Sequence, residues 1–380
     1  MKDKGPKMKT LVKERVKDRL RIVCLIVVGT LILSGCKDNV INPISSFSPG
    51  NYLLCYCGYG KIKINNILGT NPQNISLQDA NYKSGYVDDY PRWSPDGRYI
   101  AFERLRPDTF YNPFVYVYDI QNKTYTNLTS DGGEESLLPQ WTPNGKVYFS
   151  YERPVLSPTA TYIMNPDGSG KKKILNFSAS IYFYQDSYTF LYINGTEVHK
   201  TNIDSTFDVL MLVLPPPAQE QYVTIRDFNP ITGEFLVNTN IIPGLSNVIA
   251  AYSVETKQFK VFVTNHDGYN VGAPRYSKDY SKITFFEVDT TTYTKEYLSV
   301  FENGKSRRIV QLIGSTSGGD FFDASPLGFS SDSKYIAFVK NVSPGGSWVS
   351  WKSYVYTVEV ATGVTCNVDL GFSVNWSPQQ

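Results

Sequence analysis

Histidine and cysteine are both scarce in this 380-residue sequence, which holds two histidines and five cysteines. Only His199 and His266 are available as imidazole ligands, and no Cys-x-x-Cys pair occurs in the chain. Structural and catalytic zinc sites, and metal sites built from several histidines, need three or four such side chains. The composition therefore predicts no metal site and no cofactor.

The Gly-x-Ser-x-Gly elbow of serine hydrolases is also missing. The nearest stretch, residues 314–318, places Thr316 where the nucleophilic serine would stand. No serine or cysteine nucleophile is identifiable elsewhere, so His266 reads as a solvated side chain and not as half of an acid–base pair.

Long apolar runs are absent too. The longest, residues 22–33, is a stretch of twelve uncharged residues, whereas a membrane-spanning helix needs about 20. It follows a segment with nine Lys or Arg and three acidic residues, as in a signal peptide. The next residues, Leu33, Ser34, Gly35 and Cys36, match the lipobox at which bacterial lipoproteins are cleaved and acylated.

We therefore expect a lipoprotein signal peptide over residues 1–35 and a lipidated tether over residues 36–50, with Cys36 as the lipid attachment. An ordinary secretory signal is the alternative, and either Met1 or Met8 could be the start. Two acyl chains hold a protein on a membrane without a spanning helix. The expected location is the cell envelope, with the lipid in the outer membrane and the protein facing the periplasm or the cell surface; the sequence does not decide between inner and outer membrane.

Removal of the leader changes the charge balance. The formal net charge of the whole chain is +2, but residues 36–380 keep 28 basic and 32 acidic side chains, a net charge of −4. Binding to nucleic acid depends on positive charge, so we predict no nucleic-acid partner.

Three cysteines remain after Cys24 and Cys36 are set aside. Cys55, Cys57 and Cys366 permit at most one disulfide, and the sequence does not fix the pairing. Cys55 and Cys57 are two residues apart on an expected strand, so their side chains share one face. We expect them to act as small buried apolar residues.

An internal repeat is the main signal in the sequence. The stretch DYPRWSPDGRYIAFER, which begins at Asp89, returns in several related copies. Each copy carries a key aromatic residue, and successive aromatics are 42 to 53 residues apart: Trp93, Trp141, Phe183, Phe228, Tyr276, Phe329 and Trp376. Repeats of this length with four short strands are typical of propeller blades, which bury their faces by stacking on their neighbours. The sequence predicts an all-β, seven-bladed propeller over residues 51–380.

The two ends of this region are complementary. The last copy stops after one strand, and residues 51–77 supply three strands with no inner strand. We therefore predict that the ring closes by pairing N-terminal and C-terminal strands, which removes exposed sheet edges. The Ser-Pro-Asp-Gly turns are assigned to folding, because Asp and Gly favour tight turns.

The repeat resembles that of the TolB-like (WD40-like) β-propeller proteins. The resemblance rests on the Pro-aromatic-Ser-Pro-Asp-Gly segment, the following Ile-Ala-Phe strand, and the hairpin at residues 162–170. TolB itself has six blades and an α/β domain ahead of them. This chain shows seven copies and a short tether, so the family's role in the envelope is not carried over.

One face of the predicted ring carries short turns and the other carries long connections. Binding residues tend to lie on such long loops, and those expected here hold residue types that are common at binding hot spots: Arg104, Arg106, Tyr111, Arg153, Tyr269, Tyr293, Phe321, Phe322, Trp348 and Trp351. Trp348 and Trp351 fit equally well as a cover for the outer edge of a blade.

The sequence therefore favours a lipid-anchored, non-enzymatic scaffold of the cell envelope. Its partners would be the membrane, through the lipid, and an envelope protein or glycan. The alternative is an enzyme that acts on envelope polysaccharide or peptide with carboxylates in the axial channel, since carboxylate separations across a ring are not visible in a sequence.

Overall fold

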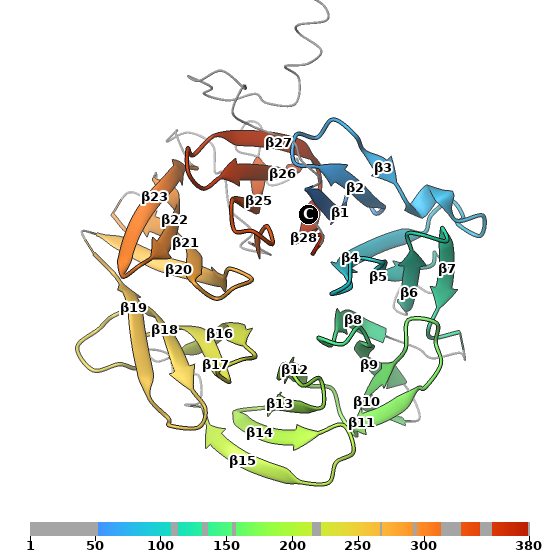
Figure 1. The fold of residues 1–380 in the computed structure, drawn as a ribbon, viewed down its shortest axis with the longest axis horizontal. Helices are drawn as coiled ribbons and strands as arrows, with labels where there is room; N and C mark the ends of the chain where they lie inside the picture. The colour runs from blue at the N-terminus through green and yellow to red at the C-terminus, as the bar shows by residue number, and fades with distance from the viewer. Residues whose placement is uncertain are drawn as a thin grey trace, which may run out of the picture.

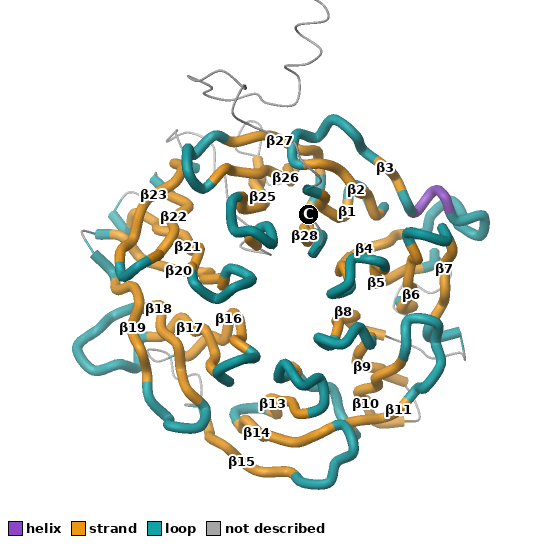
Figure 2. Tube along the Cα trace, viewed as in Figure 1, coloured by secondary structure: helices purple, strands orange, loops and turns teal. Residues whose placement is uncertain are grey.

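Seven four-stranded antiparallel sheets surround a central axis in the computed structural model (Figure 1). The structure describes residues 52–107, 113–130, 136–153, 157–214, 222–266, 268–291, 295–312, 328–342 and 352–378. The helix η3 (Ser76–Gln78) is a single 3-10 turn, and strands make up nearly all other regular structure in this part of the chain (Figure 2). The prediction of an all-β, seven-bladed propeller is confirmed.

The blades are numbered here in chain order, and the innermost strand of each is given first. Blades 1 to 4 consist of the following strands: β28 (Phe372–Trp376), β1 (Leu53–Cys57), β2 (Ile62–Asn66) and β3 (Gln73–Asn74); β4 (Val87–Trp93), β5 (Tyr99–Leu105), β6 (Phe114–Asp119) and β7 (Thr124–Asn127); β8 (Ser136–Trp141), β9 (Val147–Arg153), β10 (Ser157–Met164) and β11 (Lys172–Leu175); β12 (Ser180–Phe183), β13 (Thr189–Asn194), β14 (Glu197–Asn202) and β15 (Asp208–Val213).

Blades 5 to 7 complete the ring. They consist of the following strands: β16 (Val223–Asn229), β17 (Glu234–Thr239), β18 (Val248–Ser253) and β19 (Phe259–Thr264); β20 (Tyr269–Tyr276), β21 (Lys282–Asp289), β22 (Glu296–Glu302) and β23 (Lys305–Gln311); β24 (Gly328–Phe329), β25 (Tyr335–Val342), β26 (Lys352–Glu359) and β27 (Thr365–Leu370).

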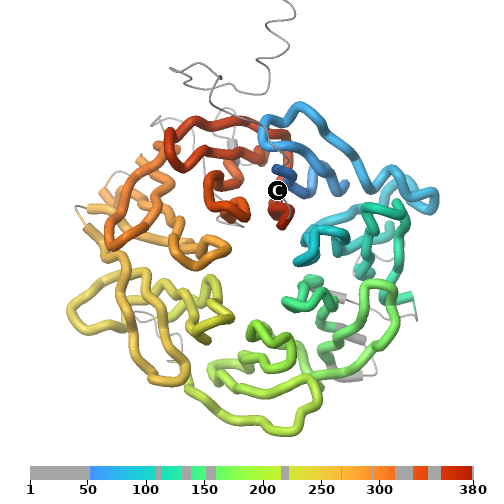
Figure 3. The backbone as a smooth tube through the Cα atoms, viewed as in Figure 1, coloured from blue at the N-terminus to red at the C-terminus, as the bar shows by residue number. Residues whose placement is uncertain are grey.

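Blade 1 is built from both ends of the propeller. Strand β28 pairs antiparallel with β1, with Leu54 opposite Trp376 and Cys55 opposite Asn375. Figure 3 shows the first and last described segments side by side in this blade. The predicted ring closure is confirmed.

The Ser-Pro-Asp-Gly turn is stabilised by its own side chains. In blade 2 the Ser94 hydroxyl donates to Asp96 at 2.5 Å and accepts from the Tyr99 amide at 2.8 Å. Gly97 adopts a φ of 71°, in the left-handed region that suits glycine. The same bonds recur around Ser277 in blade 6 and Ser330 in blade 7. These residues serve the turn, as the sequence indicated.

The repeated aromatic residues join neighbouring blades. Five of the seven are buried, and Trp141 and Tyr276 pack as partly buried members of core clusters. The indole nitrogen of Trp141 donates to the Arg92 carbonyl of the preceding blade at 2.9 Å, and Trp376 makes the equivalent bond to Gly328 at 2.6 Å. The repeat position therefore supplies both the core and the contact between blades.

Cys55 and Cys57 lie on β1 and are completely buried as free thiols. Burial raises the pKa of both, that of Cys57 to about 12. Both belong to the core between blades 1 and 2, which confirms their expected role as buried apolar residues. Cys366 is also buried, in the core between blades 7 and 1.

Successive connections within an antiparallel blade alternate between the two faces of the ring. The short-turn face carries the first-to-second and third-to-fourth turns, such as residues 94–98 and 120–123. The long-loop face carries the second-to-third and blade-to-blade connections. Among these, residues 240–247 and most of residues 265–268 belong to the described part.

Candidate functional site

Arg104 does not lie on the long-loop face as expected. It is the sixth residue of strand β5 and its side chain is completely buried. The guanidinium makes a two-pronged bond to Asp88, with Nε to Oδ1 at 2.7 Å and Nη2 to Oδ2 at 2.8 Å, and Nη1 bonds Asp79. The rings of Tyr116 and Tyr82 face it at 4.5 and 5.0 Å. The assignment of Arg104 to a binding loop was wrong, because two carboxylates draw it into the blade.

The charges of this ion-pair cluster favour one another and act against the effect of burial. Burial tends to lower the pKa of Arg104, but the carboxylates of Asp88 and Asp79 outweigh burial and raise it. Burial raises the pKa of Asp88, and the bond to Arg104 opposes that rise. The cluster fixes the connection from β3 to β4, since Asp79 follows η3 and Asp88 lies on β4. Its role is structural.

Tyr269 begins strand β20 and packs against charged and aromatic side chains. Arg308 lies over its ring at 4.3 Å and over that of Tyr297 at 4.2 Å. The same guanidinium bonds the buried Glu287 at 2.8 Å. His266 Nε2 also lies 3.5 Å from Glu287, so this histidine has a charged neighbour and is not simply solvated. This group ties β20 to β21 and β23.

The other expected binding residues have varied positions. Arg106 is half-buried, with its guanidinium 4.0 Å above the ring of Phe114. Arg153 is the last residue of strand β9 and not part of a loop. The remaining candidates lie outside the described residues: Cys36, Tyr111, Tyr293, Phe321, Phe322, Trp348 and Trp351.

The residue just before each repeated aromatic forms a second ring of equivalent positions on the innermost strands. Two of these side chains accept a bond from the backbone amide of the next blade's aromatic. Asn375 accepts from Trp93 at 2.9 Å, and Asp227 accepts from Tyr276 at 2.9 Å. The seven positions are occupied by Arg92, Gln140, Tyr182, Asp227, Arg275, Gly328 and Asn375.

Two positions of this ring, in blades 2 and 6, carry arginine. Burial lowers the pKa of Arg92, and the positive charge of Arg275 lowers it further. Arg92 belongs to blade 2 and Arg275 to blade 6, which are not neighbours. An interaction between their charges therefore crosses the centre of the ring. Both side chains are half-buried.

Further polar side chains lie near these arginines, and we call the whole set the axial group: Arg92, Tyr182, Arg226, Asp227 and Arg275. Arg226 on β16 is exposed, yet the surrounding protein lowers its pKa by desolvation and Arg275 lowers it further. Burial raises the pKa of Tyr182, with Asp227 raising it and Arg275 lowering it. Blades 2, 4, 5 and 6 thus all contribute charged or phenolic groups to the axis.

The axial carboxylates and the axial arginines differ in their bonding. Asp227 accepts from the backbone amides of Phe228 and Tyr276, and Asp89 accepts from the amide of Tyr90. In the described part of the chain, Arg226 and Arg275 make no hydrogen bond and no ion pair within 4.0 Å. The carboxylates therefore bond the backbone; Arg275 and Asp227 interact through their charges, which lowers the pKa of Asp227 against the effect of burial, but they share no hydrogen bond.

A cavity of about 730 Å³ adjoins this axial group between blades 3 and 4. Hydroxyl, amide and aromatic side chains line it together with a few aliphatic residues, and the lining includes Gln140, Tyr148, Ser150, Thr161, Ser178, Ser180 and Tyr182. Tyr182 belongs to both the cavity and the axial group, and burial raises the pKa of Tyr148, which Arg92 opposes. Residues 178–180 precede β12 on the long-loop face, so the cavity extends from the axis toward that face.

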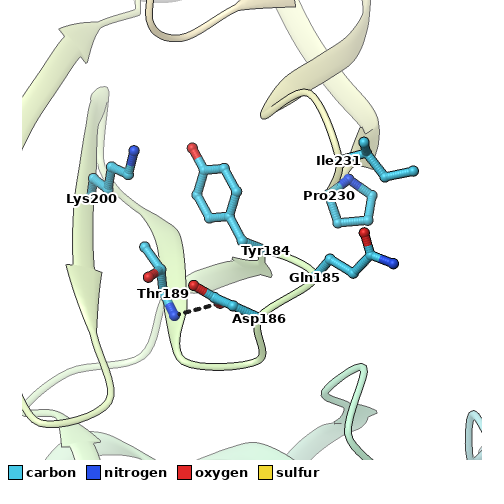
Figure 4. A pocket seen from close by; sticks show the side chains of 7 residues that line it. All are labelled: Tyr184, Gln185, Asp186, Thr189, Lys200, Pro230 and Ile231. Carbon is cyan, nitrogen blue, oxygen red and sulfur yellow. Dashed lines mark hydrogen bonds between the residues drawn. The ribbon is translucent and has the colours of Figure 1, made fainter.

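A smaller pocket of about 280 Å³ lies on the short-turn face between blades 4 and 5 (Figure 4). Its cation, Lys200, pairs with Glu255 at 2.7 Å and lies 4.9 Å from the ring centre of Tyr184. Asp186 accepts from the amides of Tyr188 and Thr189 within its own turn. The charged groups here are already bonded, unlike Arg226 and Arg275 at the axis.

Across the part of the chain that the structure describes, no three His, Cys, Asp or Glu side chains are grouped so as to hold a metal ion. No helix within the same residues is long and apolar enough to cross a membrane.

Comparison with solved structures identifies proteins of similar fold. An oligogalacturonate lyase in complex with manganese aligns with a TM-score of 0.55 and 8% identity, over 84% of each chain. A prolyl endopeptidase aligns with a TM-score of 0.56 and 12% identity, over 85% of this chain and 50% of its own. The likeness is one of fold. This chain spans about half the length of that endopeptidase.

TolB proteins are also among the structural neighbours. TolB from Acinetobacter baumannii aligns with a TM-score of 0.46 and 13% identity, over 87% of this chain and 67% of its own. No protein-family model matches the sequence, and no curated protein matches it.

The axial arginines were missed by the reasoning from sequence, although a signal for them exists. Each stands directly before a repeated aromatic residue, so the aligned copies give one axial side chain per blade. The backbone there carries a bulge, with Tyr90 and Ala273 at φ of 50° three residues before their aromatics. Such bulges re-aim side chains, and alternation along a regular strand does not foresee this.

Proposed function

We propose that this chain is a lipid-anchored scaffold of the cell envelope that binds a protein or glycan partner without transforming it. The observation that supports the proposal is the cavity of about 730 Å³ between blades 3 and 4, which adjoins the axis and extends to the long-loop face. Ligand sites are typically concave, with a few polar groups among apolar walls. The lipid would be attached to Cys36, and it would keep the cavity at a membrane surface.

Obstruction of the cavity tests the binding role. Ser180 is an exposed residue of its lining, so Ser180→Trp should fill the opening and leave the fold intact. The full chain, purified in detergent, is screened against immobilised oligosaccharides and peptides from envelope fractions. For any oligosaccharide or peptide that the wild type binds, we expect Ser180→Trp to weaken binding at least tenfold, which equals about 1.4 kcal/mol.

Ser306→Trp is the matched control, because Ser306 is exposed on the outer strand of blade 6. It should bind like the wild type. Equal binding by wild type and Ser180→Trp, with both folded, would contradict the assignment of the cavity as the binding site.

Metabolic labelling tests the anchor. A labelled fatty acid should mark the wild-type protein, and Cys36→Ala should remove the label and release a soluble protein. Full labelling of Cys36→Ala would contradict the lipid attachment, independently of what the cavity binds.

A second candidate function is an enzyme that acts on envelope polysaccharide or peptide. It is favoured by Glu103, whose pKa is raised to about 7 by burial, with Asp89 raising it and Arg92 lowering it. A carboxyl group with such a pKa suits proton transfer near neutral pH. Release of shorter products by the wild type, abolished in Glu103→Gln and Asp89→Asn, would establish this function in place of the first.

A further inference from the structure

We propose that the axial group recognises carboxylate groups, and that the ligand is an acidic oligosaccharide. The proposal rests on the proposed binding function and names the chemical class of its ligand. Arg92 and Arg275 would bind carboxylates at the axis, Arg226 would lie at the opening, and the cavity between blades 3 and 4 would hold sugar rings.

The first argument is the state of the arginines. Arg92, Arg226 and Arg275 all lie on innermost strands, in blades 2, 5 and 6. Like charges in a partly desolvated place repel, and desolvation together with the charge of Arg275 lowers the pKa of Arg92 and of Arg226. Arg275 and Arg226 have no bonded partner within the described residues. A bound anion would relieve the repulsion, and guanidinium groups match carboxylates through two parallel bonds.

The second argument is that the neighbouring carboxylates do not neutralise this group by direct bonds. Asp227 and Asp89 accept from backbone amides, and Glu103 accepts from the amide of Leu138. The pKa of Glu103 is raised to about 7, so near neutral pH a large fraction of this group is uncharged. Burial raises the pKa of Asp227 and of Asp89 as well, so burial opposes the ionisation of the carboxyl groups near the three arginines.

The third argument concerns the choice of a glycan over a peptide. The cavity beside the arginines is lined by serine and threonine hydroxyls, the Gln140 amide and the Tyr148 and Tyr182 rings. Hydroxyls and amides donate and accept, as sugar hydroxyls require, and a tyrosine offers an apolar face together with a polar tip. The Tyr182 hydroxyl makes no hydrogen bond in the described structure, so it is available to a ligand.

Calorimetric titration of the full chain in detergent tests the proposal. The probes are a linear trimer of hexuronic acid, the neutral hexose trimer of the same linkage, and a hexaglutamate peptide. We expect the acidic trimer to bind at least tenfold more tightly than the other two, with an affinity that falls as salt screens the charges.

The variants identify the residues. Arg92→Met with Arg275→Met should weaken binding of the acidic trimer at least tenfold and abolish most of its advantage over the neutral trimer. Arg226→Met alone, at an exposed position, should weaken it less. Lys305→Met removes one positive charge from the exposed outer strand of blade 6 and should have no effect. Arg275→Lys keeps the charge but loses the two-pronged geometry, so it should bind with intermediate affinity.

Each outcome decides the proposal. Equal affinity for acidic and neutral trimers would overturn carboxylate recognition, while loss of binding in Ser180→Trp would still support the cavity. Tighter binding of hexaglutamate with the same arginine dependence would overturn the glycan assignment. Failure of all three probes, or unchanged affinity in folded arginine variants, would overturn the axial site itself.

Discussion

Arg104 and the axial arginines show how the same residue type serves two purposes in one fold. Arg104 is buried between Asp79 and Asp88 and under two tyrosine rings, so every part of its guanidinium is occupied. Arg92 and Arg275 lie on the innermost strands of blades 2 and 6, and the charge of Arg275 lowers the pKa of Arg92. Burial and carboxylate partners both separate them: Arg104 is completely buried with two bonded carboxylates, whereas Arg92 and Arg275 are half-buried and form no ion pair within 4.0 Å among the described residues.

Glu296 shows a third arrangement of an ionisable residue, a buried carboxyl group that is neutral. Its carboxyl group is buried in blade 6, and burial alone raises its pKa to about 8. Desolvation makes a buried carboxylate costly, so the group stays neutral below that pH. Arg104 is thus paired with two carboxylates, Glu296 is neutral below about pH 8, and the axial arginines are charged. The following variants test these distinctions.

The largest effect is expected for Arg104→Met. The substitution leaves the carboxyl groups of Asp79 and Asp88 buried without their cation, and breaking such a pair typically costs about 3–5 kcal/mol. Denaturant unfolding at pH 7 should show this loss. A variant that unfolds at the wild-type denaturant concentration would mean that the cluster is not structural.

The next effect is a pH dependence at Glu296. The pKa is about 8 in the folded protein against 4.5 for the ordinary side chain, so the folded state holds the proton more tightly. The stabilisation is fully present below pH 4.5 and is lost as the pH rises through 8, by roughly 2–4 kcal/mol. Glu296→Gln should remove this part of the slope, measured by unfolding at pH 5 and pH 9. A parallel slope in both proteins would refute the assignment.

A smaller effect on stability is expected at the axis. Arg92→Met with Arg275→Met removes two like charges that make no ion pair within 4.0 Å among the described residues, so the free energy of unfolding should stay within about 1 kcal/mol of the wild type. Unfolding in denaturant, without ligand, measures it. A loss comparable with that of Arg104→Met would show that the axial arginines are structural too.

The smallest effect is expected for Arg98→Met on the short-turn face. Arg98 also bonds a carboxylate, Asp119, at 2.8 Å, but its side chain is 38% exposed. Water and salt screen such pairs, so they add little. The melting temperature should change by no more than about 2 °C. A drop like that of Arg104→Met would contradict the link between burial and the value of a pair.

The fold was predictable because its signals are local and repeated. The aromatics, such as Trp93 and Trp376, mark the blades, and turns such as Ser94–Arg98 set the hairpins by bonds within a few residues. The closure was predictable because the unmatched strands at the two ends are complementary. Lipid attachment at Cys36 stays a prediction.

The site was harder to foresee because it depends on distant partners. Arg104 looked like a loop residue, and only the fold brings Asp79 and Asp88 to it from the preceding connection and strand. Arg92 and Arg275 are 183 positions apart in the sequence, and a bulge in each inner strand sets their direction. Neither fact is visible in residue type or spacing alone.

The pairing of β1 with β28 also determines when blade 1 can be completed during synthesis. Strand β1 is the first strand of the propeller in chain order and β28 the last, so blade 1 lacks its inner strand until synthesis has passed Trp376. Until then the apolar side chains of β1, such as Leu54, have an unpaired edge beside them. Non-local pairing of this kind is slow and leaves the chain prone to aggregation. Completion of the ring therefore acts as a check that the whole propeller has been made, and a prematurely ended chain would present an open edge to chaperones and proteases.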